Sequence, residues 1–302
     1  MTISLLAAAY LFFGGAGAGT AFWAALADMR WPGARQRRAS ARALGVAAAF
    51  LAAGILCLVF DLGRPDQALL LFVNPTFSYL TVGTYLLTAL VLIVLILLLA
   101  RFTAGAKLQE SASFVVLRIV GAMASLGVMV YTGLLLRDLA PIRLWTSWWL
   151  PVLFLASSLA AGAAAYLLCA RPAEETPAVR RAVMDRFSRL DLILVLCEIL
   201  ACVAYLVSVA GTELGLRGVL ALLTGAQAPL FWGGFVVCGI AIPLAADVCS
   251  LARPKAFGEM TPVFVAFAGI AGCFCLRVSL VLAGAHVVIY GDRDGGQTDT
   301  EV

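Results

Sequence analysis

Three ionisable residues stand inside long apolar stretches, where a charge is costly and usually has a function. Arg277 lies about 15 residues into the stretch 262–286, roughly 22 Å along a helix. At that depth its guanidinium either pairs with polar groups inside the protein or extends outward to water. Glu198 lies about seven residues into the stretch 191–210, where it acts as a proton relay or as a neutral, hydrogen-bonded structural group. Arg118 stands near the end of another stretch, and we expect its long side chain to reach water.

Other polar residues stand where apolar stretches end. Asp61 and Arg64, in the segment Asp-Leu-Gly-Arg-Pro, are three residues apart and can share one helix face. They form either a helix cap with a surface ion pair or a polar wall beside a ligand. The hydroxyl of Tyr131 belongs either to an interfacial aromatic belt or to a site where it donates to the carbonyl of a quinone. Asp61, Tyr131 and Arg277 fall in the same half of the membrane, which favours a common site there.

Metal ligands are scarce in this sequence. The one histidine, His286, cannot supply both ligands of a b-type haem. The eight cysteines form neither a C-x-x-C nor a C-x-x-C-H motif, so the usual ligand sets for an iron–sulfur cluster or a c-type haem are missing. We therefore expect no haem, no iron–sulfur cluster and no metal in this chain, and we interpret most cysteines as small apolar helix residues.

The composition determines the class of element that positions these residues. Of the 302 residues, 63% are hydrophobic and 13% are charged, and the mean hydropathy is +1.02. A soluble domain has about 45–50% apolar and about 25% charged residues. The sequence therefore indicates an integral membrane protein and excludes a soluble enzyme, a disulfide-built secreted domain and a disordered chain. The net charge of +4 does not indicate nucleic-acid binding, because the basic residues lie in loops beside the membrane.

Apolar stretches of about 20 residues predict eight transmembrane helices. We expect them at residues 3–27, 43–60, 77–100, 114–136, 149–170, 191–210, 229–250 and 262–286. The loops between them are too short for a soluble domain, so residues 1–302 are expected to form a single membrane domain. In the first helix, Gly15 and Gly19 are four residues apart and let another backbone approach closely.

The basic residues predict the orientation. Most of the 21 Lys and Arg residues lie in the loops after the first, third, fifth and seventh helices. By the positive-inside rule these loops face the cytoplasm, and both termini lie outside. Asp191 and Asp247 stand at inner helix ends, where we expect water to solvate them.

Two features indicate contact with the membrane interface. The segment Leu214–Thr224 is amphipathic enough to lie flat at the outer surface. Trp145, Trp148 and Trp149 precede a helix that re-enters the membrane, which predicts an interfacial aromatic belt.

Motifs spread over about 270 residues resemble, in order, those of the NrfD/polysulfide reductase membrane-subunit family. They lie at Tyr10–Gly15, Asp61–Pro65, Tyr131–Leu136, Leu150–Ala163, Glu198–Ile199, Phe231–Leu244 and Leu276–Gly284. Each motif alone is weak, but their order makes the resemblance specific. The chain departs from some relatives in lacking a histidine or other polar quinone ligand in the first helix. It also has Gly284-Ala285-His286 where some relatives have Ala-Gly-Gln, so His286 is either a replacement polar partner or a solvated terminal residue.

The resemblance implies a cofactor-free membrane anchor subunit of a multi-subunit oxidoreductase. With it we expect an all-α integral membrane protein, with eight transmembrane helices as two four-helix bundles. Quinone or menaquinone would be a substrate held by Asp61, Arg64, Tyr131 and Arg277, with Glu198 and Ser157 moving protons.

The resemblance also implies partners and a location. Electrons would pass between the quinol and a ferredoxin-like iron–sulfur subunit on the outer face, which in turn contacts a molybdopterin catalytic subunit. The protein would lie in the cytoplasmic (inner) membrane of a bacterium or archaeon and would not be catalytic alone.

Two other functions remain open. A purely structural anchor would lack a working quinone site, and Tyr131 and Arg277 would only face packing partners. A secondary transporter would need helices broken at the midplane. Pro243 in the seventh stretch is the best candidate for such a break, but the other half has no counterpart.

Overall fold

The computed structural model describes residues 5–31, 33–62, 79–103, 105, 108, 111–138, 142–170, 177–252 and 261–294. The described residues are helical almost throughout and contain no strand. Eight of the helical segments are long and apolar enough to cross a membrane, by length and composition. The predicted all-helical membrane fold with eight spans is therefore confirmed.

The helices of the first half are α1 (Leu5–Arg30), α2 (Ala34–Leu62), α4 (Tyr79–Thr103) and α6 (Ala112–Asp138). A short 3-10 turn, η1 (Arg143–Trp145), leads into the second half. There the elements are α7 (Trp149–Ala170), α8 (Pro177–Ala210), α9 (Glu213–Thr224), the π-helix η2 (Leu230–Ala241), α10 (Ile242–Ala252) and α11 (Thr261–Asp294). The fifth span agrees with its prediction at both ends.

Two helices begin earlier in the sequence than the apolar pattern predicted. α2 begins at Ala34 rather than 43, and α8 begins at Pro177 rather than 191. The added turns are rich in arginine and alanine, which favour helix but not membrane burial. The hydropathy pattern therefore marked the membrane-crossing part of each helix rather than the whole helix.

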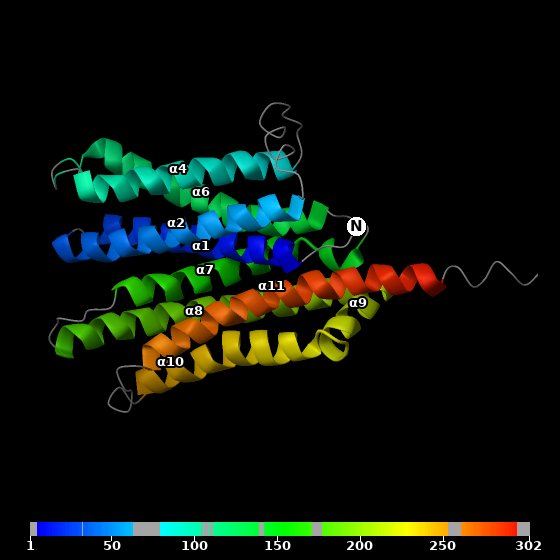
Figure 1. The fold of residues 1–302 in the computed structure, drawn as a ribbon. Coiled ribbons are helices and arrows are strands. Elements are labelled where there is room, and N and C mark those ends of the chain that lie inside the picture. Colours follow the sequence, from blue (N-terminus) through cyan, green and yellow to red (C-terminus); the bar gives the residue numbers. More distant parts are fainter. Residues whose placement is uncertain are drawn as a thin grey trace, which may run out of the picture.

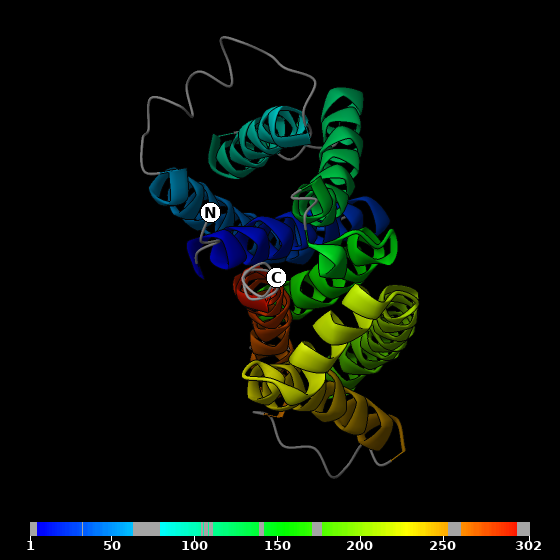
Figure 2. The same ribbon diagram turned by 90° about the vertical axis from the view of Figure 1, so that its right-hand side faces the viewer.

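α1 occupies the centre of the molecule. It packs against α2, α4 and α6 of its own half and against α7 and α11 of the other half. Figure 2 shows α1 in dark blue between the green and cyan helices on one side and the red α11 on the other. The structure consequently does not confirm a division into two separate four-helix bundles.

Small residues bring α1 and α7 into backbone contact. A Cβ atom added at Gly19 would collide with the carbonyl of Ser158 and approach Gly162. At Gly15 an added Cβ would lie 2.5 Å from the Ser158 hydroxyl. The predicted close approach at Gly15 and Gly19 is therefore confirmed, and α7 is the helix that approaches.

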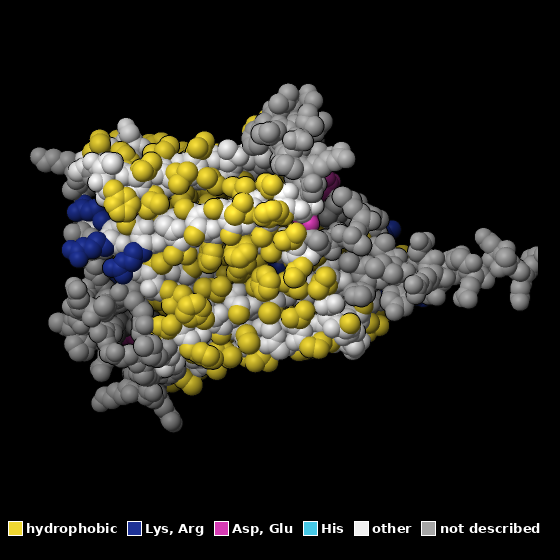
Figure 3. All heavy atoms as spheres, viewed as in Figure 1, with side chains coloured by type: hydrophobic (Ala, Val, Ile, Leu, Met, Phe, Trp, Pro, Cys, Tyr) yellow, Lys and Arg dark blue, Asp and Glu magenta, His cyan; other side chains and the backbone are white. Residues whose placement is uncertain are grey.

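The two ends of the helix array differ in charge. All eight spans run in roughly the same direction or its reverse (Figure 1), and apolar side chains cover the flank between their ends (Figure 3). The dark blue Lys and Arg side chains in Figure 3 gather at one end, away from the N-terminus. We call this the basic end, and the end where α1 begins and α11 finishes the terminal end. Which end faces the cytoplasm stays a prediction from the positive-inside rule.

The predicted exposure of Trp145 and of Arg118 is wrong. Trp145 is fully buried, whereas Trp148 and Trp149 are exposed as a belt requires. Arg118 is also buried, because its Nε lies 3.8 Å from the Asp28 carboxylate, which also pairs with Arg101. A buried partner on α1 thus holds Arg118 within the protein.

The segment Leu214–Thr224 forms most of the separate helix α9. The Thr212 hydroxyl accepts a hydrogen bond from the Gly215 amide at its start. Val219 and Leu222 pack on the protein, whereas Leu214, Leu216 and Leu220 are exposed. This sidedness agrees with the predicted amphipathic character, and its position at the membrane interface stays a prediction.

Candidate functional site

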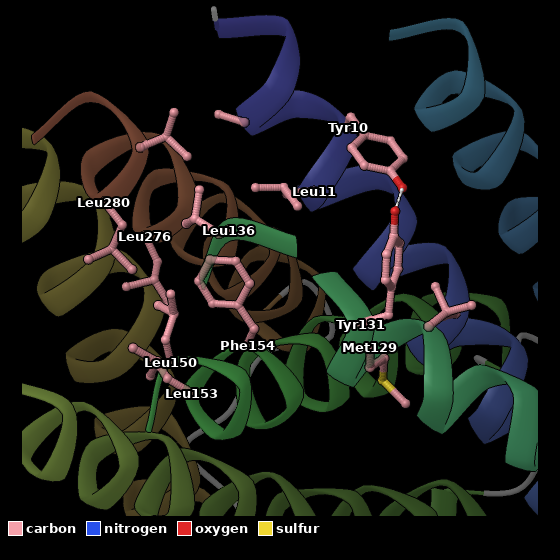
Figure 4. Close-up of a cluster of buried hydrophobic side chains, with 14 of the residues drawn as sticks. Tyr10, Leu11, Met129, Tyr131, Leu136, Leu150, Leu153, Phe154, Leu276 and Leu280 are labelled. Atoms are coloured by element: carbon pink, nitrogen blue, oxygen red, sulfur yellow. Dashed lines mark hydrogen bonds between the residues drawn. The ribbon is translucent and has the colours of Figure 1, made fainter. Parts of the chain in front are cut away.

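A pair of tyrosines joins α1 and α6 near the terminal end. The Tyr10 hydroxyl donates a hydrogen bond to the Tyr131 hydroxyl over 3.2 Å, and both side chains are buried. Figure 4 shows the two rings meeting tip to tip. A phenol hydroxyl can donate once and accept as well. Tyr131 therefore keeps its own proton to donate to a third group, and no such acceptor is found among the described residues.

Gly83 of α4 makes room for the ring of Tyr131. A Cβ atom added at Gly83 would fall directly on that ring. On the other side of α6, Gly133 lies against the backbone of Pro151 in α7. The Tyr131 ring is therefore confined by the backbone of α4, and its helix is confined by α7.

Asp61 lies at the terminal end of α2, and its side chain is exposed. α2 runs antiparallel to α1, with Gly54 packed against Gly14. Asp61 follows Gly54 by seven residues and Tyr10 precedes Gly14 by four, so Asp61 lies about 5 Å beyond Tyr10 along the helix axes. Asp61 makes a contact of its own. Arg64 lies outside the described residues, so its pairing with Asp61 stays a prediction.

Arg277 of α11 is fully buried and points into the protein. Its three nitrogens donate to Leu11 O (3.2 Å), Ser157 Oγ (3.2 Å), Cys273 O (3.1 Å), Cys273 Sγ (2.7 Å), Phe154 O (3.3 Å) and Ser158 Oγ (2.7 Å). The guanidinium carbon also lies 4.8 Å from the centre of the Phe154 ring. The inward, paired interpretation of Arg277 is therefore correct, and the guanidinium nitrogens are all used within the protein.

Glu198 of α8 extends this polar group. Its side chain is 3% exposed and shares a hydrogen bond with the Ser157 hydroxyl. Ser157 also accepts the hydrogen bond from Arg277. A serine hydroxyl can accept from one neighbour and donate to another. Ser157 thus connects a carboxyl group on α8 with a guanidinium on α11.

The structure groups the predicted residues differently from the sequence. Arg277 lies with Ser157 and Glu198, whereas Tyr131 lies with Tyr10. The two groups nevertheless lie at one depth, because Tyr10 bonds Tyr131 while the carbonyl of the next residue, Leu11, accepts from Arg277. We call them the tyrosine pair (Tyr10, Tyr131) and the arginine cluster (Arg277, Ser157, Ser158, Glu198).

Tyr10 was missed as a site residue by the sequence analysis. Its neighbours are apolar or small, and its place in the first helix was interpreted only as part of a family motif. The available signal was its depth, about five residues into the first span, which matches the depth of Tyr131 before the end of the fourth.

His286 and the predicted absence of metals remain untested. His286 lies on α11, in the part where side chains are not described. Within the described ranges, no group of three or more His, Cys, Asp and Glu side chains could hold a metal ion.

The segment between α6 and α7 is firmly attached at the terminal end. The Trp145 indole donates to the Leu280 carbonyl of α11 over 3.1 Å, and Gly284 leaves room for its ring. The Tyr205 hydroxyl of α8 donates to the Leu144 carbonyl over 2.7 Å. Residues 142–148 therefore present an ordered surface at this end.

Comparison with known proteins gives two findings. The family model described as "Polysulphide reductase, NrfD" matches residues 2–289. The sequence is also similar to the C subunit of polysulfide reductase from Wolinella succinogenes, with 29% identity over 257 residues that cover 79% of each protein. The family match includes every residue of the tyrosine pair and of the arginine cluster.

Proposed function

The chain belongs to the NrfD polysulphide reductase family, and we propose that it is the quinone-binding membrane subunit of a multi-subunit oxidoreductase. The similar Wolinella protein is named as one component of a polysulfide reductase, which supports a role as one subunit among several. The observation that carries the proposal is the tyrosine pair. It places the Tyr131 hydroxyl, a hydrogen-bond donor, between α1 and α6 near the terminal end.

The tyrosine pair suits the head group of a quinol or quinone. Oxidation of a quinol releases two electrons and two protons and leaves two carbonyl oxygens. The Tyr131 hydroxyl would donate to one such oxygen, while Tyr10 holds the Tyr131 oxygen in place from behind. Asp61, about one helical turn nearer the terminal end, would accept the released protons and pass them to water.

Electrons would leave the quinol at the same end. The protein would supply the shaped site while the quinone supplies the redox chemistry. A ferredoxin-like iron–sulfur subunit would dock on the ordered surface of residues 142–148 and pass electrons to a molybdopterin catalytic subunit. We expect the loop 61–76 to contact this partner as well, and most of that loop lies outside the described residues. The complex would lie in the cytoplasmic membrane of a bacterium or archaeon.

The arginine cluster would carry protons rather than bind the quinone. Arg277 has no nitrogen free for a ligand, so its predicted role as a direct quinone ligand has no donor in this geometry. We assign it instead to positioning Ser157, which in turn contacts Glu198. Glu198 and Ser157 would then exchange protons in the second half of the protein.

Quinol oxidation by the purified complex tests the proposal. We compare the wild type with Tyr131→Phe, which removes one hydroxyl and keeps the ring in the space beside Gly83. We expect at least a tenfold loss of quinol turnover, because removing a donor aimed at charge that develops in the transition state costs about 2.7–4 kcal/mol. Activity with an artificial donor that reduces the partner subunits directly should be unchanged.

Tyr85→Phe on α4 is the matched control, because Tyr85 is 43% exposed and does not share a helix face with Gly83, two residues before it. Unchanged quinol turnover in Tyr131→Phe would contradict the proposed site and favour the purely structural anchor. Glu198→Gln tests the proton role separately. If this variant leaves both turnover and proton movement unchanged, Glu198 is a structural residue.

A further inference from the structure

Asp191 of α8 faces Asp247 of α10 in the half of the protein nearer the basic end. Figure 1 shows α8 and α10 close together at that end, and the two helices pack against each other. The sequence predicted that water would solvate both aspartates. That prediction is wrong for Asp247, which is only 5% exposed.

The two carboxyl groups share a hydrogen bond. Asp247 also bonds Ser188 of α8, and the Ser250 hydroxyl donates to Ser188 over 2.9 Å. The second oxygen of the Asp247 carboxyl group, Oδ2, is buried and has no hydrogen-bond partner among the described residues.

A hydrogen bond between two carboxyl groups requires a proton, because an ionised carboxylate can only accept. Two ionised carboxylates in hydrogen-bonding contact would also repel each other, in a region that solvates charge poorly. The unpartnered Oδ2 of Asp247 supports the same conclusion, since a buried carboxylate oxygen without a donor is costly and a protonated carboxyl group is much less so.

No described basic side chain neutralises the pair. On α8, Arg186 and Arg189 are exposed to solvent. α10 carries Asp247 as its one charged residue, and α7 and η2 carry none. The part of α11 from Thr261 to Ile270, which packs near α10, also carries no charge. Glu198, a buried carboxyl group on α8 itself, interacts electrostatically with Asp191.

Glu198 lies on the same side of α8 as Asp191. The two residues are seven positions apart, two helical turns or about 10 Å. Residues 194 and 195 lie between them and are the buried side chains Leu194 and Val195. Leu194 and Val195 thus form an apolar layer between the two polar groups, and a proton crosses this layer only on water that enters it.

We propose that Asp191 and Asp247 share one proton and form the basic-end station of a proton path to Glu198. The proton leaves the shared hydrogen bond for the Glu198 carboxylate, and the pair then takes a replacement proton from water at the basic end. One proton enters and one is delivered, with no change in oxidation state. The delivery step rests on the proton role of Glu198 proposed above, whereas the shared proton does not.

The shared proton is tested by labelling with dicyclohexylcarbodiimide, a lipid-soluble reagent that adds to protonated carboxyl groups. The full-length protein in its complex is labelled in phospholipid vesicles at neutral pH, and the adducts are located by mass spectrometry. We expect Asp191 or Asp247, but not both in one molecule, to be labelled at least tenfold more than Asp138. Asp138 is an exposed aspartate at the end of α6 and serves as the control.

Asp247→Asn sharpens this test. The asparagine amide can donate to an ionised Asp191, so the reason for Asp191 to hold a proton is removed. We expect labelling of Asp191 to fall at least tenfold in this variant. Undiminished labelling of Asp191, or equal labelling of Asp138 in the wild type, would overturn the shared proton. Because no turnover is involved, this result is independent of whether the protein oxidises quinol.

Delivery to Glu198 is tested by proton movement during quinol turnover in vesicles with a pH indicator on the basic-end side. We expect Asp247→Asn and Glu198→Gln to lose proton uptake on that side to the same extent, with Asp138→Asn unchanged. Uptake that survives in Asp247→Asn but not in Glu198→Gln would overturn the delivery step. A wild-type complex without quinol turnover would contradict the proposed function instead.

Discussion

The two sides of α1 carry polar groups of opposite character at one depth. On one side, the tyrosine pair consists of neutral side chains joined by a single hydrogen bond. On the other side, Arg277 makes six hydrogen bonds to α1, α7 and its own helix. In the tyrosine pair the Tyr131 hydroxyl is still available as a donor, whereas all the guanidinium nitrogens of Arg277 already donate hydrogen bonds.

This difference separates a binding site from a structural connection. A charge buried in a membrane protein is tolerated only when it is fully hydrogen-bonded, so Arg277 joins three helices and has little capacity left for a ligand. Burying a neutral hydroxyl costs much less free energy than burying a charge, so a hydroxyl can stay buried while its proton has no acceptor. We therefore expect loss of the Arg277 guanidinium to affect assembly and mutations near the pair to affect quinol turnover.

The largest effect should come from Arg277→Gln. The shorter neutral side group does not reach the same acceptors, and breaking a buried charged network costs about 3–5 kcal/mol. We expect little assembled complex on a native gel and a lower thermal midpoint in detergent. Arg189→Gln is the control, because Arg189 is exposed on α8 and lies outside the proposed docking surface. If Arg277→Gln assembles as well as this control, the cluster does not hold the two halves together.

A smaller effect on assembly, but a large one on turnover, is expected for Gly83→Ala. The added methyl group collides with the Tyr131 ring and must displace it. Displacement by about 1 Å can cost about 100-fold in rate, so quinol oxidation should fall by about that factor while the complex still assembles.

Gly45→Ala is the matched control for Gly83→Ala, because it adds the same methyl group to a helix glycine that has open space around it. Alanine favours helix equally at both positions. Similar turnover in the two variants would show that the position of the Tyr131 ring does not matter for quinol oxidation.

The smallest effect is expected for Tyr10→Phe. Tyr131 keeps its own hydroxyl but loses the partner that orients it. One neutral hydrogen bond contributes about 1 kcal/mol, which corresponds to about a fivefold loss of quinol turnover. A loss as large as that of Tyr131→Phe would mean that Tyr10 itself contacts the quinone.

The sequence predicted the spans well because hydropathy acts locally along the polypeptide. Residues 149–170 were placed correctly at both ends, and the inward direction of Arg277 followed in part from its depth. The close contact at Gly15 and Gly19 also followed from spacing alone.

What the sequence could not predict depends on contacts between distant helices. Arg118 and Trp145 stand where side chains usually reach water, yet Asp28 and the Leu280 carbonyl hold them inside. The division of Tyr131 and Arg277 into two groups likewise depends on α1 lying between them. The depth of a residue follows from its position along the span, but the neighbouring helix that its side chain faces does not.

Photolabelling with an azido-substituted quinone tests the central claim most directly. The assembled complex would be irradiated with the quinone analogue, with and without excess unlabelled quinone, and the adducts located by mass spectrometry. Our account predicts adducts within about one turn of Gly83 or Tyr131, on α4 or α6, that excess quinone removes. Adducts that instead lie beside Ser157 or Glu198, on α7 or α8, would contradict it.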